Sequence, residues 1–281
     1  MKILLTGTSG FTGKHLMKQA EVQGHEVVPL EADLTDREAI RIGLVKLTFD
    51  SVVHLAAIRF VNHADDAAFY AVNTVGTTQL LSALSELSTP PRCVLLASSA
   101  NVYGNCEISP IVEEQLPAPV NHYATSKLAM EFMARSYSDR LPIIITRPFN
   151  YTGVGQSPDF LIPKLVSHFK SRSPKIELGN VHVEREFNDV RMVCDTYLRL
   201  VSEGQVGEIY NICSGQPYTL KTVIDLLISL TGHNPEIKVK PKYFRQNEVV
   251  RLCGDPAKLD GVMGDRPSYS LRETLAWMLD S

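Results

Sequence analysis

Six short runs of apolar residues, separated by longer segments, limit the folds that this chain can adopt. The runs are KILLT (2–6), EVVPL (26–30), SVVHLAA (51–57), CVLLASS (93–99), PIIITRP (142–148) and EIYNIC (208–213). Such runs are typical of strands buried on both faces of a parallel sheet. Helical spacing of apolar residues fills four of the segments between them, at 12–23, 36–47, 64–87 and 121–139. This alternation predicts an α/β fold, a Rossmann-type doubly wound parallel sheet.

The start of one helix can be predicted from local sequence. TDRE (35–38) offers Thr35 as the N-cap, with Glu38 at the third helical position. A capping box of this kind satisfies backbone N–H groups that have no helical partner.

Residues after RPFNYTG (147–153) follow a different pattern. Segments punctuated by glycine and proline replace the regular alternation, and 208–212 is one strong strand among them. We therefore expect a smaller C-terminal α/β lobe over the carboxyl edge of the sheet. No Pro- or Ser-rich linker separates the two parts, so the chain should cross between them more than once. The predicted sheet domain is 1–152 plus about 189–213, and the predicted lobe is about 153–188 and 214–281.

The composition argues against several classes of partner. The chain has 281 residues, 44% of them hydrophobic, which is enough for a sizeable core. Its net charge is −3 and like charges do not cluster, so we expect no nucleic-acid partner and no membrane partner. MKILLTG has too short an apolar run for a signal peptide, and no stretch approaches about 18 uncharged apolar residues. A cytoplasmic location is therefore expected.

The cysteines and histidines predict neither a disulfide framework nor a metal site. The five cysteines contain no C-x-x-C pair, and their odd number and apolar neighbours predict buried, reduced thiols. The histidines lack metal-ligand spacing, so no metal is expected, and His54 at the end of a strand should be a packed, hydrogen-bonded residue.

A glycine-rich loop, TGTSGFTG (6–13), follows the first predicted strand and opens the first helix. In such a loop the first glycine, Gly7, permits a tight turn, and the second, Gly10, lets backbone N–H groups approach a pyrophosphate. The third, Gly13, lets helix and strand pack closely. The spacing is G-x-x-G-x-x-G. Its position predicts a dinucleotide site that includes Thr8, Phe11 and Thr12.

The segment after the second strand bears on the choice of cofactor. Glu31 lies about 20 residues past the glycine loop, where a carboxylate can hold ribose hydroxyls, which favours NAD(H) slightly over NADP(H). A solvated loop acid is the alternative. Asp33, before Leu34, could accept a hydrogen bond from the adenine amino group, or could equally be a turn residue.

Tyr123 and Lys127 stand four residues apart at the head of a predicted helix, so their side chains share one face. A tyrosine has a pKa of about 10 and needs a nearby cation to act as an acid or base near neutrality. Lys127 can be that cation. The serines that end CVLLASS could hold a substrate carbonyl oxygen while Tyr123 protonates it. His122 should face about 100° away from Tyr123, at the rim or surface.

With these residues in view, the chain resembles the extended short-chain dehydrogenase/reductases, which act mainly on nucleotide sugars. The resemblance covers almost the whole chain and runs in order through TGTSGFTG, Asp33-Leu34, HLAA (54–57), Asn73 in YAVNTVGT, SSANVYG (98–104), YATSK (123–127) and RPFN (147–150). It implies an NAD(P)-dependent oxidoreductase.

The resemblance also implies roles for individual residues. Tyr123 would be the general acid/base, and Lys127 would lower its pKa and hold the nicotinamide ribose. Ser99 would bind the reacting oxygen, and Asn73 would support the geometry of the site.

Two further segments would line the same site by this resemblance. Leu55, Ala56 and Ala57 would contact the cofactor, and Pro148 and Asn150 would meet the nicotinamide end and the substrate.

Segments in the second lobe are similar to those of family members that reduce GDP-4-keto-6-deoxymannose. They imply that a nucleoside-diphosphate 4-keto-6-deoxy sugar is reduced at C4. In the same terms Arg185 and Arg245 are expected diphosphate or sugar contacts, because guanidinium groups suit phosphate oxygens; surface salt bridges are the alternative. Dehydratases of this family need an acid next to Ser99. Here that place is Ala100-Asn101, which disfavours dehydration.

Two other functions remain open. A nucleotide-sugar 4-epimerase with tightly bound NAD would use the same Ser99, Tyr123 and Lys127, and a non-catalytic dinucleotide-sensing protein would need neither the tyrosine nor the lysine. In the resembled family, helices like 64–87 and 121–139 form a four-helix bundle, so a homodimer through these helices is expected.

Overall fold

The computed structural model describes residues 1–59, 65–181, 183–240 and 249–281. Its centre is a six-stranded parallel sheet in the order β10-β5-β4-β3-β1-β2. The strands are β1 (Lys2–Thr6), β2 (Glu26–Pro29), β3 (Ser51–His54), β4 (Val94–Ala97), β5 (Ile143–Pro148) and β10 (Ile209–Ile212). All six lie within the apolar runs, so the predicted α/β class and parallel sheet are confirmed.

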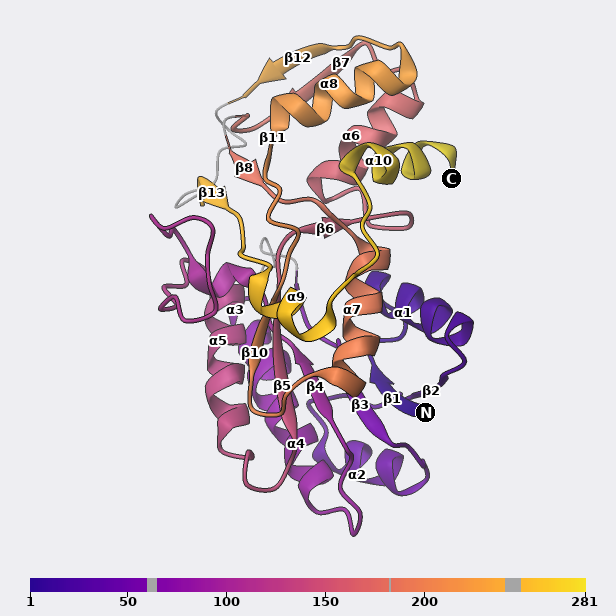
Figure 1. Ribbon diagram of the computed structural model, residues 1–281, viewed down its shortest axis with the longest axis vertical. Coiled ribbons are helices and arrows are strands. Elements are labelled where there is room, and N and C mark those ends of the chain that lie inside the picture. Colours follow the sequence, from indigo (N-terminus) through magenta and orange to yellow (C-terminus); the bar gives the residue numbers. More distant parts are fainter. Residues whose placement is uncertain (60–64, 182, 241–248) are drawn as a thin grey trace.

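Helices cover both faces of this sheet (Figure 1). One face carries α1 (Phe11–Val22) and α7 (Val190–Glu203), and α9 (Ala257–Met263) joins the same core. The other carries α2 (Arg37–Val45), α4 (Thr77–Ser85) and α5 (His122–Arg135). Successive residues of a strand point to opposite faces of the sheet. In β1, Ile3 and Leu5 pack with α1 and α7, whereas Leu4 packs with α2 and α4. This explains why the strands are almost continuously apolar.

Two local predictions on the second face need correction. Asp36, not Thr35, is the N-cap of α2, because its side chain accepts from the N–H groups of Glu38 and Ala39 at 3.0 Å each. Thr35 instead donates to Asp33, so its hydroxyl is used in the preceding turn. The segment predicted as one helix over 64–87 contains α3 (Asp66–Phe69), a π-helical stretch, η1 (Tyr70–Gly76), and α4.

A smaller lobe lies above the carboxyl edge of the sheet (Figure 1). Its separate core is built by α6 (Leu161–Lys170), β7 (Lys175–Leu178), α8 (Leu220–Thr231), β12 (Glu236–Val239) and α10 (Leu271–Asp280). The chain returns to the sheet domain in α7 and β10 and again in α9. The residue limits given above for the two parts stay a prediction.

Three-stranded and two-stranded ladders connect the parts. β8 (Glu184–Arg185) pairs with β11 (Tyr218–Thr219) and β13 (Arg251–Leu252), and β6 (Tyr151–Thr152) pairs with β9 (Asn188–Asp189). These short ladders lie where the chain passes from one core to the other.

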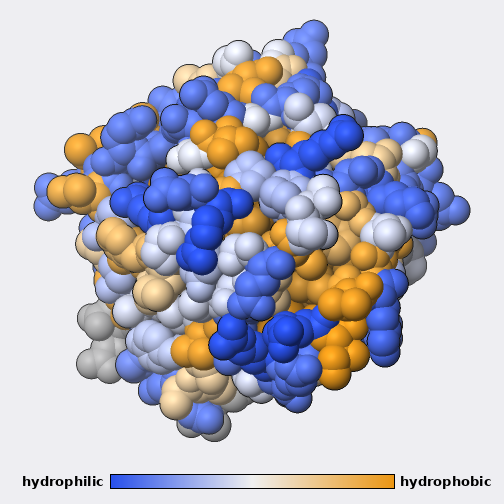
Figure 2. All heavy atoms as spheres, turned by 90° about the horizontal axis from the view of Figure 1, so that it is seen from below, coloured by the Kyte–Doolittle hydropathy of each residue, from blue (hydrophilic) through white to orange (hydrophobic). Residues whose placement is uncertain are grey.

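Seen from below, hydrophobic residues form one larger patch among hydrophilic ones (Figure 2). Among the described residues, no helix has the length and apolar character needed to span a bilayer. All five cysteines are free, and four of them are buried, with Cys106 half-buried.

Candidate active site

The carboxyl ends of neighbouring parallel strands bring the predicted site residues to one edge of the sheet. Gly7 follows β1, the segment 55–57 follows β3, Ser99 follows β4, and β5 ends at Pro148. β1 lies between β2 and β3, so the strand order reverses there. Ligands of open α/β sheets bind at such a switch point.

The glycine loop is shaped for a diphosphate. Gly7 has a φ of +75°, and a Cβ there would lie 2.8 Å from the backbone nitrogen of Ala56. A Cβ on Gly13 would overlap the carbonyl oxygen of Gly7, and Gly10 is the N-cap of α1. The first N–H groups of a helix have no carbonyl partner within it and carry partial positive charge. The residues present therefore fit the predicted dinucleotide.

The side chains within the loop are used inside the protein. Phe11 is buried and stacks on Tyr151 with ring centroids 6.2 Å apart. Thr12 Oγ1 hydrogen-bonds the Tyr151 hydroxyl at 2.8 Å. At Phe11 and Thr12 the backbone N–H groups, not the side chains, are therefore the groups that a diphosphate would meet.

The segment after β2 contains both predicted cofactor acids. Glu31 is exposed, two residues past the end of β2. Asp33 Oδ1 accepts from Thr35 N at 2.8 Å and from Thr35 Oγ1 at 2.7 Å, and these bonds lower the pKa of Asp33. Asp33 is thus a turn residue in this structure, while Leu34 is buried in the sheet core.

Ser99 and Tyr123 are brought together by β4 and α5. Ser99 is buried, caps the 3₁₀ turn η2 (Ala100–Tyr103) by accepting from Asn101 N at 3.2 Å, and lies close enough to the Tyr123 side chain to lower its pKa. Asn121 begins α5 by accepting from Ala124 N at 2.9 Å, which puts Tyr123 in the first helical turn.

The environment of Tyr123 keeps its hydroxyl protonated. Burial raises the pKa of Tyr123 to about 12. Ser99 and the positive charge of Arg59 lower this pKa, whereas Tyr151 raises it. An acid of this kind holds its proton at neutral pH and can donate it to a stronger base.

Lys127 lies one turn along α5 and is 4% exposed. Its Nζ donates to the carbonyl oxygen of Ala97 at 2.7 Å. Burial lowers the pKa of Lys127 to about 8, and Glu131 raises it. The lysine is thus a buried cation at the end of β4, close to the Ser99 segment.

Asn73, in the π-helical stretch η1, hydrogen-bonds both the segment after β3 and α5. Its Oδ1 accepts from Ile58 N at 2.9 Å, and its Nδ2 donates to Ile58 O at 2.9 Å and to Ser126 Oγ at 3.0 Å. A π-helical turn often marks a functional position. Here it directs Asn73 at both the segment after β3 and the residue beside Lys127.

Arg59 was missed by sequence reasoning. Its guanidinium lies 5.7 Å from the ring centroid of Phe160, immediately before α6 of the second lobe. It also lowers the pKa of both Tyr123 and Tyr151. A lone arginine two residues past HLAA carries no local signal; only the fold brings it to the tyrosines.

The predicted substrate residues are placed less directly. Asn150 has an exposed side chain, and its carbonyl accepts from Asn188 N at 2.9 Å. Arg185 donates to the carbonyl oxygens of Glu184, at 2.8 Å, Val249 and Val250. Arg245 lies outside the described residues.

His54 and His122 lie where the sequence predicted. His54 is buried and hydrogen-bonds Thr6 at 2.7 Å and Thr77 at 2.9 Å; burial lowers its pKa to about 3, so the ring is neutral. His122 is exposed and bonds the Tyr70 hydroxyl at 2.9 Å. Within the part of the chain described, no group of three or more potential metal ligands occurs.

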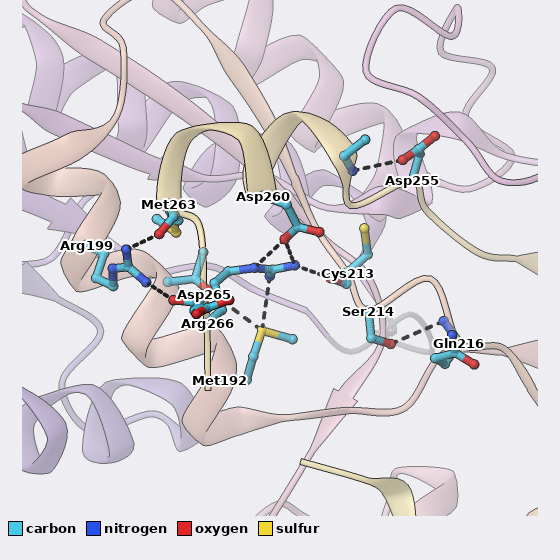
Figure 3. Close-up of polar contacts among 12 residues, drawn as sticks. Met192, Arg199, Cys213, Ser214, Gln216, Asp255, Asp260, Met263, Asp265 and Arg266 are labelled. Carbon is cyan, nitrogen blue, oxygen red and sulfur yellow. Dashed lines mark hydrogen bonds and ion pairs between the residues drawn. The ribbon is translucent and has the colours of Figure 1, made fainter. Parts of the chain in front are cut away.

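A separate hollow of about 420 Å³ lies beside α7 and α9, and its described lining includes neither Ser99 nor Tyr123. Arg266, from the segment after α9, is part of this lining, and Figure 3 shows its side chain among Asp260, Cys213 and Met192. Its guanidinium is held by Asp260, with Nε–Oδ1 at 2.8 Å, and by the carbonyl of Cys213 at 3.4 Å. The hollow is therefore separate from the sheet edge where Ser99, Tyr123 and Lys127 lie.

Comparisons with known proteins agree with this geometry. Residues 14–278 match the family model for GDP-mannose 4,6 dehydratase. The chain is 39% identical over 271 residues to GDP-6-deoxy-D-talose 4-dehydrogenase of Aggregatibacter actinomycetemcomitans, covering 94% of this chain and 92% of that protein. It is 34% identical over 295 residues to GDP-6-deoxy-D-mannose reductase of Pseudomonas aeruginosa, covering 99% and 96%.

A solved structure extends the likeness to three dimensions. RMD from Pseudomonas aeruginosa, complexed with NADPH, superposes with a TM-score of 0.91 at 32% identity, covering 99% of this chain and 97% of that one. The similarity therefore includes both the sheet domain and the second lobe.

Proposed function

We propose, since this chain belongs to the GDP-mannose 4,6-dehydratase family, that it reduces the C4 keto group of GDP-4-keto-6-deoxymannose. The chain is an NAD(P)-dependent oxidoreductase of the short-chain dehydrogenase/reductase type that acts on a nucleotide sugar. The observation that carries the proposal is that Ser99 lies beside Tyr123, with the buried cation Lys127 one turn away.

The chemistry divides between the cofactor and three side chains. When bound, NAD(P)H supplies the hydride that C4 accepts. Tyr123 donates its proton to the C4 oxygen, so that the carbonyl becomes an alcohol and the phenolate remains. Ser99 donates a hydrogen bond to the same oxygen and stabilises the negative charge that develops there.

Lys127 then favours the phenolate that Tyr123 becomes. A buried positive charge near the phenolate lowers the energy of the ionised form. The same charge would hold the nicotinamide ribose, as the family resemblance implies. Asn73 keeps Ser126, and with it the first turns of α5, in register with the segment after β3.

Reduction is favoured over dehydration by the residues beside Ser99. Eliminating water from a hexose needs a second proton shuttle, and Ala100 and Asn101 supply no carboxylate. The two named relatives differ in the C4 configuration of their sugars. The product is therefore a GDP-6-deoxyhexose whose C4 configuration is to be measured.

The proposal can be tested by following reduced-nicotinamide absorbance with GDP-4-keto-6-deoxymannose, separately with NADH and NADPH. One cofactor should be oxidised per sugar reduced. A 4-epimerase would instead retain NAD and consume no reduced cofactor, and that result would replace the reductase assignment. The comparison also ranks the cofactors, for which Glu31 favours NADH slightly.

We also propose a homodimer through the helices within 64–87 and 121–139. Three large apolar side chains on them are exposed, namely Val75 at 50%, Phe132 at 58% and Met133 at 42%. Burying such side chains against a second copy removes apolar surface from water. Light scattering should give a dimer, and Phe132→Asp should give a monomer.

A further inference from the structure

Behind the Ser99–Tyr123 pair lies a fully buried ion pair. Arg147 Nη2 lies 2.6 Å from Glu131 Oε2, and Arg147 Nε donates to Glu131 Oε1 at 3.0 Å. The side chains of Arg147 and Glu131 are 3% and 1% exposed. This bidentate contact joins α5 to β5.

The Glu131 carboxylate also accepts a hydrogen bond from the residue that follows β4. Ser98 Oγ donates to Glu131 Oε1 at 2.5 Å, and Ser98 directly precedes Ser99. Lys127 Nζ donates to the carbonyl of Ala97, the residue before Ser98. Lys127 and Glu131, one turn apart on α5, therefore hold consecutive residues of the segment that carries Ser99.

Arg147 is fixed independently of Glu131. Its Nη1 donates to the Tyr103 hydroxyl at 3.0 Å and to the carbonyl of Glu113 at 3.2 Å. Tyr103 in turn donates to Asn211 Oδ1 at 2.8 Å on β10. Glu131 is thus connected to three neighbouring strands: to the end of β4 through Ser98, to β5 through Arg147, and to β10 through Arg147 and Tyr103.

We propose, building on the function above, that Glu131 is a positioning residue of the active site. It fixes Ser98 and therefore the neighbouring Ser99, and its negative charge keeps the buried Lys127 protonated. The pattern Y-x-x-x-K-x-x-x-E over 123–131 is then one functional unit on a single helical face.

The neighbouring groups His54 and Asp66 do not keep Lys127 protonated as Glu131 does. His54 on β3 is neutral and packed against Thr6 and Thr77. Asp66 on α3 pairs with His122 at 3.4 Å on the exposed side of α5. Glu131 is the carboxylate that raises the pKa of Lys127, whereas burial lowers it.

The test uses cofactor-free protein with ¹³C-labelled lysine Cε, titrated by NMR. The Lys127 signal is assigned by its loss in Lys127→Met. Glu131→Gln alone would leave Arg147 buried without a counter-ion, so it is combined with Arg147→Met. The amide of the introduced glutamine would still offer an oxygen to Ser98. Arg147→Leu replaces Arg147→Met if the first pair of substitutions does not fold.

The native Lys127 should titrate near pH 8. Glu131 is the charged group that shifts the pKa of Lys127, and Arg147 has no comparable effect on it, so the paired variant should titrate lower, by on the order of one pH unit. Glu113→Gln is the matched control, a buried carboxylate in the same network that touches Asn211 N at 2.8 Å, and it should leave the midpoint unchanged. An unchanged midpoint in the paired variant, or an equal shift in the control, would overturn the proposal. Neither sugar nor turnover enters this measurement, so it stands even if the proposed reaction is wrong.

Discussion

Tyr123, in the first turn of α5, lies close enough to Ser99, which follows β4, for the serine to lower the pKa of the Tyr123 hydroxyl. Neither residue is unusual in its own segment. Their proximity is the basis of the proposed function, in which Ser99 would hold one carbonyl oxygen and Tyr123 would protonate it.

Removal of the Tyr123 hydroxyl should slow reduction strongly and leave the fold intact. Tyr123→Phe is expected to lower kcat by about 10²–10⁴-fold, because general acid catalysis contributes on this scale. The Kd for NADH or NADPH, measured by fluorescence, should change little. Ser99→Ala, which keeps the acid, should lose less, and turnover at the native rate in Tyr123→Phe would exclude the assigned role.

The rate of reduction should fall at alkaline pH. Burial lowers the pKa of Lys127 to about 8, below its ordinary value. In the proposed function the protonated lysine is the active form, because its charge stabilises the phenolate. kcat/KM should therefore be level below about pH 8 and drop above it as the lysine loses its charge. Lys127→Arg keeps the cation at high pH, so the alkaline limb should disappear in that variant, at a lower absolute rate. A limb that stays in place would show that another group titrates there.

Replacing Arg59 should affect the reverse reaction, oxidation of the sugar alcohol by NAD(P)⁺, more than it affects reduction of the keto sugar. Oxidation of the alcohol needs Tyr123 as a phenolate, and Arg59 lowers the pKa of Tyr123. In Arg59→Gln the acidic limb of the oxidation profile should therefore move to higher pH, whereas Arg59→Lys should stay near the native profile. Identical profiles for Arg59→Gln and the native protein would contradict the electrostatic role.

Gly13 should not tolerate a side chain. A Cβ there would overlap the Gly7 carbonyl, so Gly13→Ala should lower the free energy of unfolding by about 1–3 kcal/mol and weaken cofactor binding. Gly261→Ala is the control: it lies in α9 with no atom within 4 Å of the added Cβ, and alanine suits a helix better. Thermal unfolding of both variants compares them, and equal stability would show that the loop can relax.

The sequence was sufficient for features that depend on local pattern. The six strands follow from apolar runs, and ordered motifs predicted that the glycine loop, Tyr123, Lys127 and Ser99 would lie together; their roles stay a prediction. The N-cap of α2 was misplaced by one residue because Thr35 and Asp36 are both good caps, and the competing bond from Thr35 to Asp33 decides between them. Asn73 was recognised, yet its π-helical setting was not, because that setting depends on contacts with Ile58 and Ser126.

Contacts between distant segments could not be predicted in the same way. Arg59 reaches the tyrosines only after β3 and the second lobe are packed, and Glu131 meets Arg147 only across α5 and β5. Arg185 was expected to contact the substrate, and that role stays a prediction. In the structure it donates to backbone carbonyls of a neighbouring segment, including that of Val250 at 3.0 Å. A single side chain gives no sign of such partners in the sequence.

Transfer of deuterium from cofactor to sugar tests the central claim most directly. The protein would be incubated with GDP-4-keto-6-deoxymannose and NADH or NADPH carrying deuterium at the transferable position, and the product examined by NMR. The account predicts one deuterium at C4 of a GDP-6-deoxyhexose for each cofactor oxidised. Unlabelled product, or unchanged cofactor, from folded protein that binds the cofactor would contradict it.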